Sequence, residues 1–154
     1  MKNSPTDTFK HGIAKPVLPA VLKLTVKKEW FDLIKSSKKQ EEYREIKPYW
    51  VERLTQISKK ENYTSEEASK NLLKDKNSFP NNWGSDEYPI RPMYCFPKEY
   101  SYVEFKNGYA KDAPTIITEC KGISIGKPTK QGSQLFKEDV FLISLGSVVW
   151  SNCG

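Results

Sequence analysis

The chain has 154 residues, 37% of them hydrophobic and 12% aromatic, so it is long enough to bury one core and is not expected to be disordered throughout. Lysine and arginine outnumber aspartate and glutamate by 25 to 19, a net charge of +6. The sequence has no apolar run of membrane-span length, no secretion-signal core at its start and three widely spaced cysteines (Cys95, Cys120 and Cys153), so we expect a cytoplasmic protein with reduced thiols and no contact with a membrane.

Residues 1–17 are predicted to form a weakly ordered N-terminal leader, because this stretch is polar and interrupted by prolines. It contains His11, which is the one histidine of the sequence. A Ser-His-Asp triad or a histidine-rich zinc site would depend on that leader residue, so we expect no metal and no cofactor. The proton-transfer groups of an enzyme would then be Lys, Glu, Asp or Tyr.

Residues 1–47 hold eleven Lys and Arg against six Asp and Glu, so nearly all of the net charge lies in the first third of the chain. A one-sided excess of positive charge suits a polyanion, of which nucleic acid is the commonest. The alternative is that the lysines only support solubility.

The first regular elements are predicted to be a strand at residues 20–26 and a helix within residues 27–37. The helix has apolar residues at the spacing of one stripe, namely Trp30, Phe31, Leu33 and Ile34. That stripe cannot continue past the serines, so the helix should end near Ser36 or Ser37.

A turn then leads into a predicted strand, EEYREI, at residues 41–46. In a strand, Glu42 and Arg44 project to one face and Tyr43 to the other. Pro48 suits the first turn of a further helix, whose expected buried edge is Trp50, Leu54 and Ile57.

Residues 58–98 differ in character and are interpreted as an insertion. A capping-box pattern from Thr64 to Glu67 predicts a short helix that carries Leu72 and Leu73. A long irregular stretch follows, rich in proline and aromatic residues. Its aromatic residues are expected to form a local cluster, or alternatively a lid; they are Trp83, Tyr88, Tyr94 and Phe96.

The last third returns to strand patterns at residues 101–109, 113–127 and 139–150, and the first of these reaches an Asn-Gly turn signal. Five or six short strands and two or three helices, without regular alternation, predict an α+β fold or a small barrel.

The segment after the first helix resembles the ASCH domain family, relatives of the PUA RNA-binding fold, which carry the pattern GxKxxExR. Lys39, Glu42 and Arg44 match that pattern, and Ser37 replaces its glycine. Residues 20–57 and 101–149 are similar to the family, whereas the leader and the insertion are not. The resemblance implies a PUA-like small β-barrel with flanking helices, as a single domain at residues 18–150, and a cleft lined by the motif.

The resemblance also implies RNA-related ligands. Some small members of the family hydrolyse an amide of acylated cytidine with a lysine, a threonine and a glutamate, and ribonuclease activity is attributed to others. Lys39 matches that lysine, but Glu42 stands where the hydrolases have threonine. If the chain is an enzyme, these two residues would be its catalytic pair, although the missing threonine argues against amide hydrolysis.

The residues themselves support a ligand site at the motif. Arg44 offers a planar fork for a phosphate or carboxylate, and Lys39 a compact charge. The alternative is that Glu42 forms a structural salt bridge with either cation. Asn107, Tyr109 and Lys111 are further candidates for the border of the cleft, although the Asn-Gly turn explains that loop without a ligand.

Two aromatic residues beside the motif have two interpretations. Tyr49 and Trp50 could stack a base, or Trp50 belongs to the core. The leading hypothesis is a module that binds RNA or a modified nucleoside. The alternatives are an amidohydrolase or ribonuclease in the same cleft, and a protein-interaction domain that uses the insertion.

Overall fold

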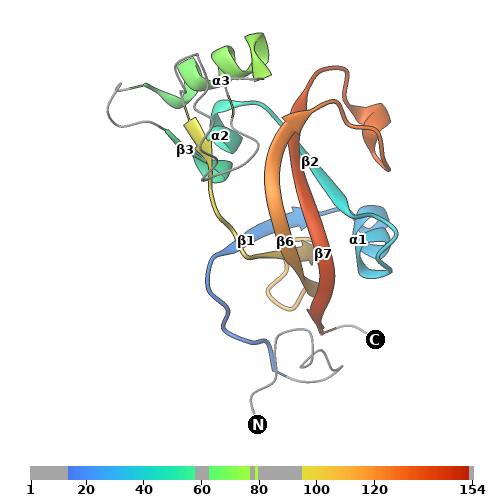
Figure 1. Cartoon of the computed structure of the whole chain (residues 1–154). Coiled ribbons are helices and arrows are strands. Elements are labelled where there is room, and N and C mark those ends of the chain that lie inside the picture. Colours follow the sequence, from blue (N-terminus) through green and yellow to red (C-terminus); the bar gives the residue numbers. More distant parts are fainter. Residues whose placement is uncertain (1–13, 58–62, 77–78, 80–94, 153–154) are drawn as a thin grey trace. The chain divides into compact units, whose positions relative to one another are not determined.

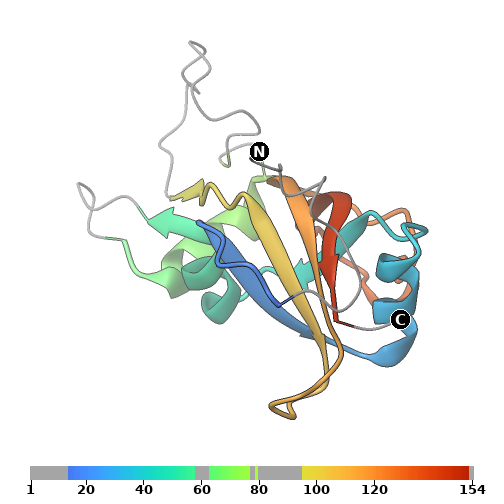
Figure 2. The same ribbon diagram turned by 90° about the horizontal axis from the view of Figure 1, so that it is seen from below.

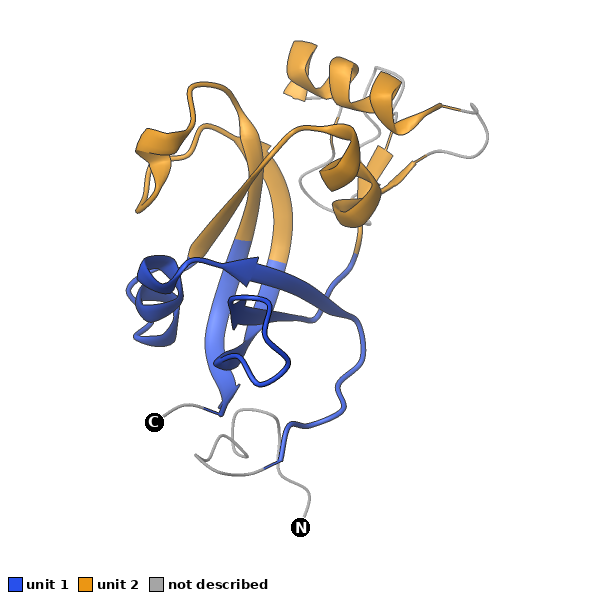
Figure 3. Ribbon diagram, turned by 180° about the vertical axis from the view of Figure 1, so that it is seen from behind, with its two compact units in different colours: residues 1–40, 99–121, 144–154 blue, residues 41–98, 122–143 orange. Residues whose placement is uncertain are grey.

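A computed structural model describes residues 14–57, 63–76, 79 and 95–152. The chain divides into two compact units (Figure 3). Unit 1 comprises residues 1–40, 99–121 and 144–154, and unit 2 comprises residues 41–98 and 122–143. The chain passes from one unit to the other within β6 (Thr115–Gly126) and within β7 (Val140–Ser151), so both strands contribute residues to each unit.

The described residues form a five-stranded sheet with the order β1-β5-β6-β7-β2 and a two-stranded sheet of β3 and β4 (Figure 1). Three α-helices accompany them, which confirms the predicted α+β class. This composition fits a small β-barrel with flanking helices. The remaining elements are β1 (Val21–Val26), α1 (Lys28–Lys35), β2 (Glu41–Glu45), α2 (Pro48–Leu54), β3 (Thr55–Ile57), α3 (Ser65–Lys74), β4 (Cys95–Pro97), β5 (Tyr102–Asn107) and the 3-10 turn η2 (Ser133–Leu135).

Unit 1 is built around β1 and β5, which run parallel with Leu22 opposite Val103 and Leu24 opposite Phe105. All four side chains are buried, because one face of each strand alternates toward the core. β5 turns into the antiparallel β6 through the loop after Asn107, where the two strands run together to a turn (Figure 2). The predicted hairpin is therefore present.

Helix α1 adds Phe31 and Ile34 to the core of unit 1 and contacts β5. These two residues are three positions apart and so share one side of the helix. Trp30 and Leu33, which the apolar stripe also included, are half-buried at its edges. The helix ends at Lys35, as the loss of apolar positions beyond Ile34 predicts.

Unit 2 contains α2, α3 and the β3–β4 pair, and α2 contacts both α3 and β3. Val51 and Leu54 on α2 and Leu72 on α3 are fully buried. The predicted capping box at the start of α3 is present, since the Thr64 hydroxyl accepts from the backbone N–H of Glu67 and the Glu67 carboxylate accepts from Thr64.

The predicted buried edge of the second helix was partly wrong. The helix ends at Leu54, because Thr55 adopts an extended conformation and its hydroxyl donates to the Val51 carbonyl at 2.6 Å. Ile57 therefore belongs to β3 and not to the helix. The buried side of α2 is Val51 and Leu54, whereas Trp50 is half-buried.

The segment interpreted as an insertion begins and ends on a short sheet that its sequence did not predict. β3 pairs with β4 in antiparallel register, with Ile57 opposite Cys95. Phe96 lies in β4 and is half-buried. Of the predicted aromatic cluster, Trp83, Tyr88 and Tyr94 lie outside the described residues. Among the described residues, no helix has the length and apolarity that crossing a membrane requires.

Candidate functional site

The three motif residues are divided between the units: Lys39 lies in unit 1, and Glu42 and Arg44 lie in unit 2. Glu42 and Arg44 both belong to β2, and Lys39 lies on the connection between α1 and β2. That the three side chains line one cleft stays a prediction.

The connection from α1 to β2 is a tight turn at Ser37, which adopts the left-handed conformation with φ of 61°. The backbone N–H groups of Lys38 and Lys39 both donate to the Leu33 carbonyl, at 2.9 and 3.0 Å. Left-handed residues of this kind end many helices, and glycine is preferred there because it has no Cβ. Ser37 occupies the position at which the pattern GxKxxExR has its glycine, so the local backbone explains that part of the pattern.

Lys39 is the most enclosed charged residue among those described, with only 2% of its surface exposed. Its neighbour Lys38 is exposed. Enclosing an ammonium group is costly unless other groups of the protein compensate its charge. The two adjacent lysines therefore differ sharply in exposure. Only the match of Lys39 to the family motif distinguishes them in the sequence.

In unit 2, Arg44 is held from two sides. One of its terminal nitrogens (Nη2) lies 2.7 Å from Oε2 of Glu42, two residues earlier on the same strand face. Its guanidinium carbon lies 4.7 Å from the centre of the Trp50 ring, at cation–π distance. The side chain of Glu42 is 9% exposed and that of Arg44 is 19% exposed. The salt bridge that the alternative interpretation of the motif expects is thus present, and it is formed with Arg44.

On the other face of β2, Tyr43 packs into the protein. Tyr43 is buried, and its hydroxyl donates to Oε1 of Glu41 at 2.8 Å and accepts from the backbone N–H of Lys130 at 2.9 Å. Its ring packs edge-on against Phe136, with centroids 5.9 Å apart. Burial and the bond to Glu41 raise the pKa of Tyr43 to about 12. The strand alternation predicted for this segment is therefore confirmed.

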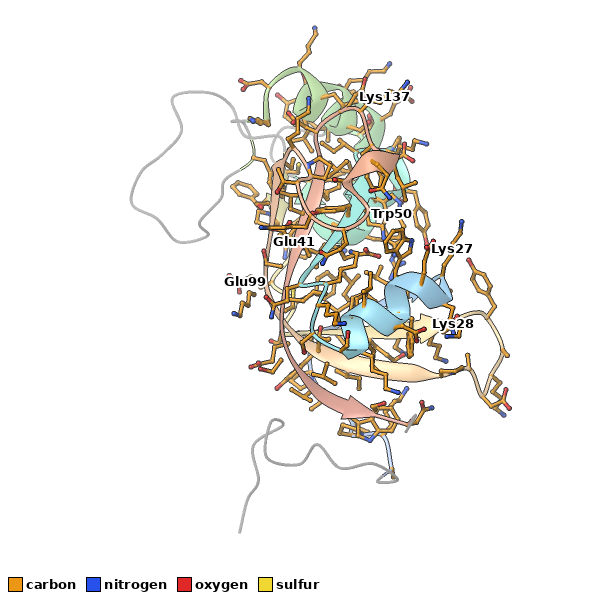
Figure 4. The ribbon with its side chains drawn as sticks, turned by 90° about the vertical axis from the view of Figure 1, so that its right-hand side faces the viewer. Lys27, Lys28, Glu41, Trp50, Glu99 and Lys137 are labelled. Atoms are coloured by element: carbon orange, nitrogen blue, oxygen red, sulfur yellow. The ribbon has the colours of Figure 1, made fainter. Side chains whose placement is uncertain are left out.

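Helix α2 extends the cationic and aromatic groups beyond Arg44. Trp50 and Tyr49 meet edge to face with centroids 4.8 Å apart, and the Arg53 guanidinium carbon lies 5.4 Å from the Trp50 ring centre and 5.8 Å from that of Tyr49. We call Arg44, Tyr49, Trp50 and Arg53 the α2 cluster; Figure 4 labels Trp50 within it. The sequence pattern missed Arg53, although its spacing of four from Tyr49 on a helix could have indicated it.

The loop candidates belong to unit 1. Asn107 ends β5 and its backbone N–H donates to the Pro114 carbonyl at 2.9 Å. Gly108 has a φ of 98°, as the Asn-Gly signal predicts, and Tyr109 is 93% exposed. Lys111 is exposed as well. That these three residues border a ligand cleft stays a prediction, because the Asn-Gly turn accounts for the conformation of the loop.

Two further features were not predicted. In unit 1, Glu104 on β5 is buried, and its carboxylate lies 2.8 Å from the Lys15 ammonium. In unit 2, a hollow of about 440 Å³ adjoins the end of β2 at Glu45 and Ile46, with Leu73 and Leu135 beside it. Its rim carries both signs of charge, so it does not select a ligand class by charge.

No protein-family model, no curated protein and no solved structure matches the chain. Within the described part of the chain, no group of three or more His, Cys, Asp and Glu side chains could hold a metal ion. The ASCH resemblance therefore stays a prediction, and a function that depends on it is a proposal.

Proposed function

We propose that the chain is an ASCH-type, PUA-like protein that binds RNA or a modified nucleoside through the face of β2 that carries Glu42 and Arg44. The observation that carries this proposal is the fixed guanidinium of Arg44, held by Glu42 at 2.7 Å and by the Trp50 ring at 4.7 Å. A guanidinium fixed in this way loses little conformational entropy when it binds a phosphate or a base edge.

Three other features support the same proposal. Ser37 has the backbone conformation that the glycine of the family pattern would favour. Lys39 is enclosed while Lys38 is exposed, as expected if only one of them belongs to the motif. The excess of positive charge in residues 1–47 suits an RNA partner. Lys39 enters the proposal only through the motif. Asn107, Tyr109 and Lys111 enter it only because they lie in residues 101–149, a second segment that resembles the family.

The main alternative is a hydrolase that acts on acylated cytidine-type nucleosides, or a ribonuclease. Glu42 replaces the threonine of the family hydrolases, and its carboxylate is engaged by Arg44. A carboxylate that neutralises a fixed arginine is better suited to orienting that arginine than to attacking a substrate. This favours binding over hydrolysis. A protein-interaction role for residues 58–98 has no specific observation in its favour.

The test compares Arg44→Lys with Lys38→Gln in titrations of labelled RNA and in thermal-shift measurements with modified nucleosides. Arg44→Lys keeps the charge and the pairing with Glu42 but loses the planar fork. We expect it to weaken binding by about tenfold or more, the effect of losing a charge-assisted hydrogen bond. Lys38→Gln removes an entire exposed charge and should weaken binding by at most about fivefold.

Equal affinities of the two variants would refute the role of Arg44. Mass spectrometry of the same mixtures separates the alternatives, because a hydrolase would release a product from the acylated nucleoside or the RNA. A binding protein would return its ligand unchanged. Circular dichroism of both variants controls for loss of the fold.

A further inference from the structure

The α2 cluster has an exposed side that the packing of the helix does not require. Val51 and Leu54 are fully buried and anchor α2 in unit 2. Tyr49, by contrast, is 59% exposed although it is a large aromatic residue. Its hydroxyl accepts from Nη1 of Arg53 at 3.4 Å, one helical turn away. An exposed ring beside a guanidinium therefore lies on a helix that is already anchored without it.

The charges around this exposed side suit an anionic ligand. Arg53 lies over both rings, at 5.4 Å from Trp50 and 5.8 Å from Tyr49. Glu52 is the one acidic residue of α2, and its carboxylate accepts from the hydroxyl of Ser65 at the start of α3. The acidic group of α2 is thus engaged by α3, and its one cation, Arg53, lies beside the rings.

We propose that Tyr49 and Arg53 form a stacking site for an unpaired RNA base, with Arg53 also contacting the phosphate of that nucleotide. This inference rests on the proposed function for its ligand class, but it concerns a different group of side chains from the Glu42–Arg44 pair. Bases stack on tyrosine rings and on guanidinium planes, and every base has such a face. Bases inside a duplex are not accessible in this way, so the site selects single-stranded RNA.

The edge-to-face contact of Tyr49 with Trp50 gives the site its geometry. The rings meet at 81° with centroids 4.8 Å apart, and Tyr49 remains 59% exposed in this contact. A base that stacks on Tyr49 would meet Arg53 beside the ring hydroxyl. The predicted preference is therefore for an accessible base with its own phosphate, without selection of base identity.

The experiment measures the affinity of a fluorescent ten-nucleotide oligouridine by anisotropy, for the unmodified protein and for Tyr49→Leu and Tyr49→Phe. An abasic strand of the same length keeps the phosphates but has no bases to stack. Tyr49→Leu should weaken binding of oligouridine by about 5- to 150-fold, the usual effect of losing one stacked base. Tyr49→Phe should bind within about threefold of the unmodified protein, because it retains the ring.

The abasic strand should bind the unmodified protein and Tyr49→Leu equally. Lys70→Gln, which removes one exposed positive charge from α3, is the matched control for Arg53→Gln, and only the latter should weaken oligouridine binding. Thermal unfolding checks that each variant is folded. Equal binding of oligouridine by Tyr49→Leu and by the unmodified protein would overturn the stacking site.

The two proposals fail in different ways. If Arg44→Lys loses affinity while Tyr49→Leu does not, the proposed function stands and the stacking site is wrong. If Tyr49→Leu loses affinity for oligouridine and for the abasic strand alike, the ring contributes to the fold or to phosphate contacts and the inference is also wrong. If the unmodified protein binds modified nucleosides but none of the strands, the stacking site alone is wrong. If it binds neither the strands nor the nucleosides, both proposals are overturned.

Discussion

Tyr43 shows how the residue next to two motif positions takes a structural role. Its side chain leaves the opposite face of β2 from Glu42 and Arg44, because successive residues of a strand alternate. Its hydroxyl joins Glu41 to the backbone of Lys130, which lies far away in the sequence. The residue therefore ties β2 to the segment before η2, and its neutral form is the one that the surroundings favour.

The raised pKa of Tyr43 predicts a loss of stability at high pH. An unfolded tyrosine ionises near pH 10, whereas in the folded protein the pKa is about 12, so the folded state binds more protons between these values. The contribution to stability is complete below pH 10 and is lost as the pH rises toward 12. Two pKa units correspond to on the order of 3 kcal/mol. The free energy of unfolding, measured with denaturant at several pH values from 8 to 11.5, tests this prediction.

Tyr43→Phe is the control for this pH dependence, because it removes the hydroxyl whose pKa is raised and keeps the ring. The variant should be less stable at pH 8, since the Lys130 N–H loses its acceptor. Its stability should then fall less steeply than that of the unmodified protein as the pH approaches 12. Parallel curves for the two proteins would contradict the assignment of the raised pKa to Tyr43.

At the scale of the element, the end of α1 explains a feature of the motif. The helix must stop and reverse before β2, and it does so with Ser37 at a φ of 61°. A residue with a Cβ is strained in this conformation, and glycine is not. Ser37→Gly should therefore stabilise the protein by roughly 0.5–1 kcal/mol, measured by denaturant unfolding at neutral pH.

Ser36 provides the matched control for that change. It adopts φ of −84° and its hydroxyl donates to the Leu33 carbonyl at 3.1 Å. Ser36→Gly removes that bond and adds backbone freedom to the unfolded state, so it should destabilise the protein by about 0.5 kcal/mol. A stabilising Ser36→Gly, or a destabilising Ser37→Gly, would show that the left-handed turn is not the source of strain.

Elements with a strong local pattern could be predicted from the sequence. The capping box at Thr64 and Glu67 and the hairpin turn at Gly108 are both present, since each depends on residues within a few positions. Helix α2 was predicted to start at Pro48, and it does. Its end was misjudged, because the pattern of Leu54 and Ile57 suits a helix as well as a strand that follows one.

The long-range features could not be predicted in the same way. β3 and β4 have three residues each and pair across about forty positions, and neither has enough length for an alternating pattern. The contact of Arg44 with Trp50 joins a strand to a helix, so no helical or strand period indicates it. At the site, the Glu42–Arg44 pair was foreseeable from its spacing, whereas the burial of Lys39 depends on packing from other segments.

At the scale of the whole molecule, the uneven charge has two interpretations, contact with RNA or support of solubility, and the salt dependence of binding separates them. Residues 1–47 carry eleven Lys and Arg and six Asp and Glu, whereas the remaining residues are almost balanced. If this excess contributes to binding, lysines within residues 1–47 should displace counterions from RNA, and lysines elsewhere should not. Lys27 and Lys28 at the start of α1 (Figure 4) and Lys70 and Lys74 on α3 make the comparison, because all four are exposed.

Binding of single-stranded RNA should weaken linearly in log–log form as NaCl increases from 50 to 300 mM, with a slope of about −0.7 for each phosphate engaged. Lys27→Gln combined with Lys28→Gln should reduce the magnitude of that slope by up to about 1.4, since two phosphate contacts are removed. The paired change at Lys70 and Lys74 should leave the slope unaltered, although it removes the same charge. Each lost phosphate contact reduces the number of counterions released from RNA. Equal slopes for both double variants would therefore mean that the charge of the first third supports solubility and does not contact RNA.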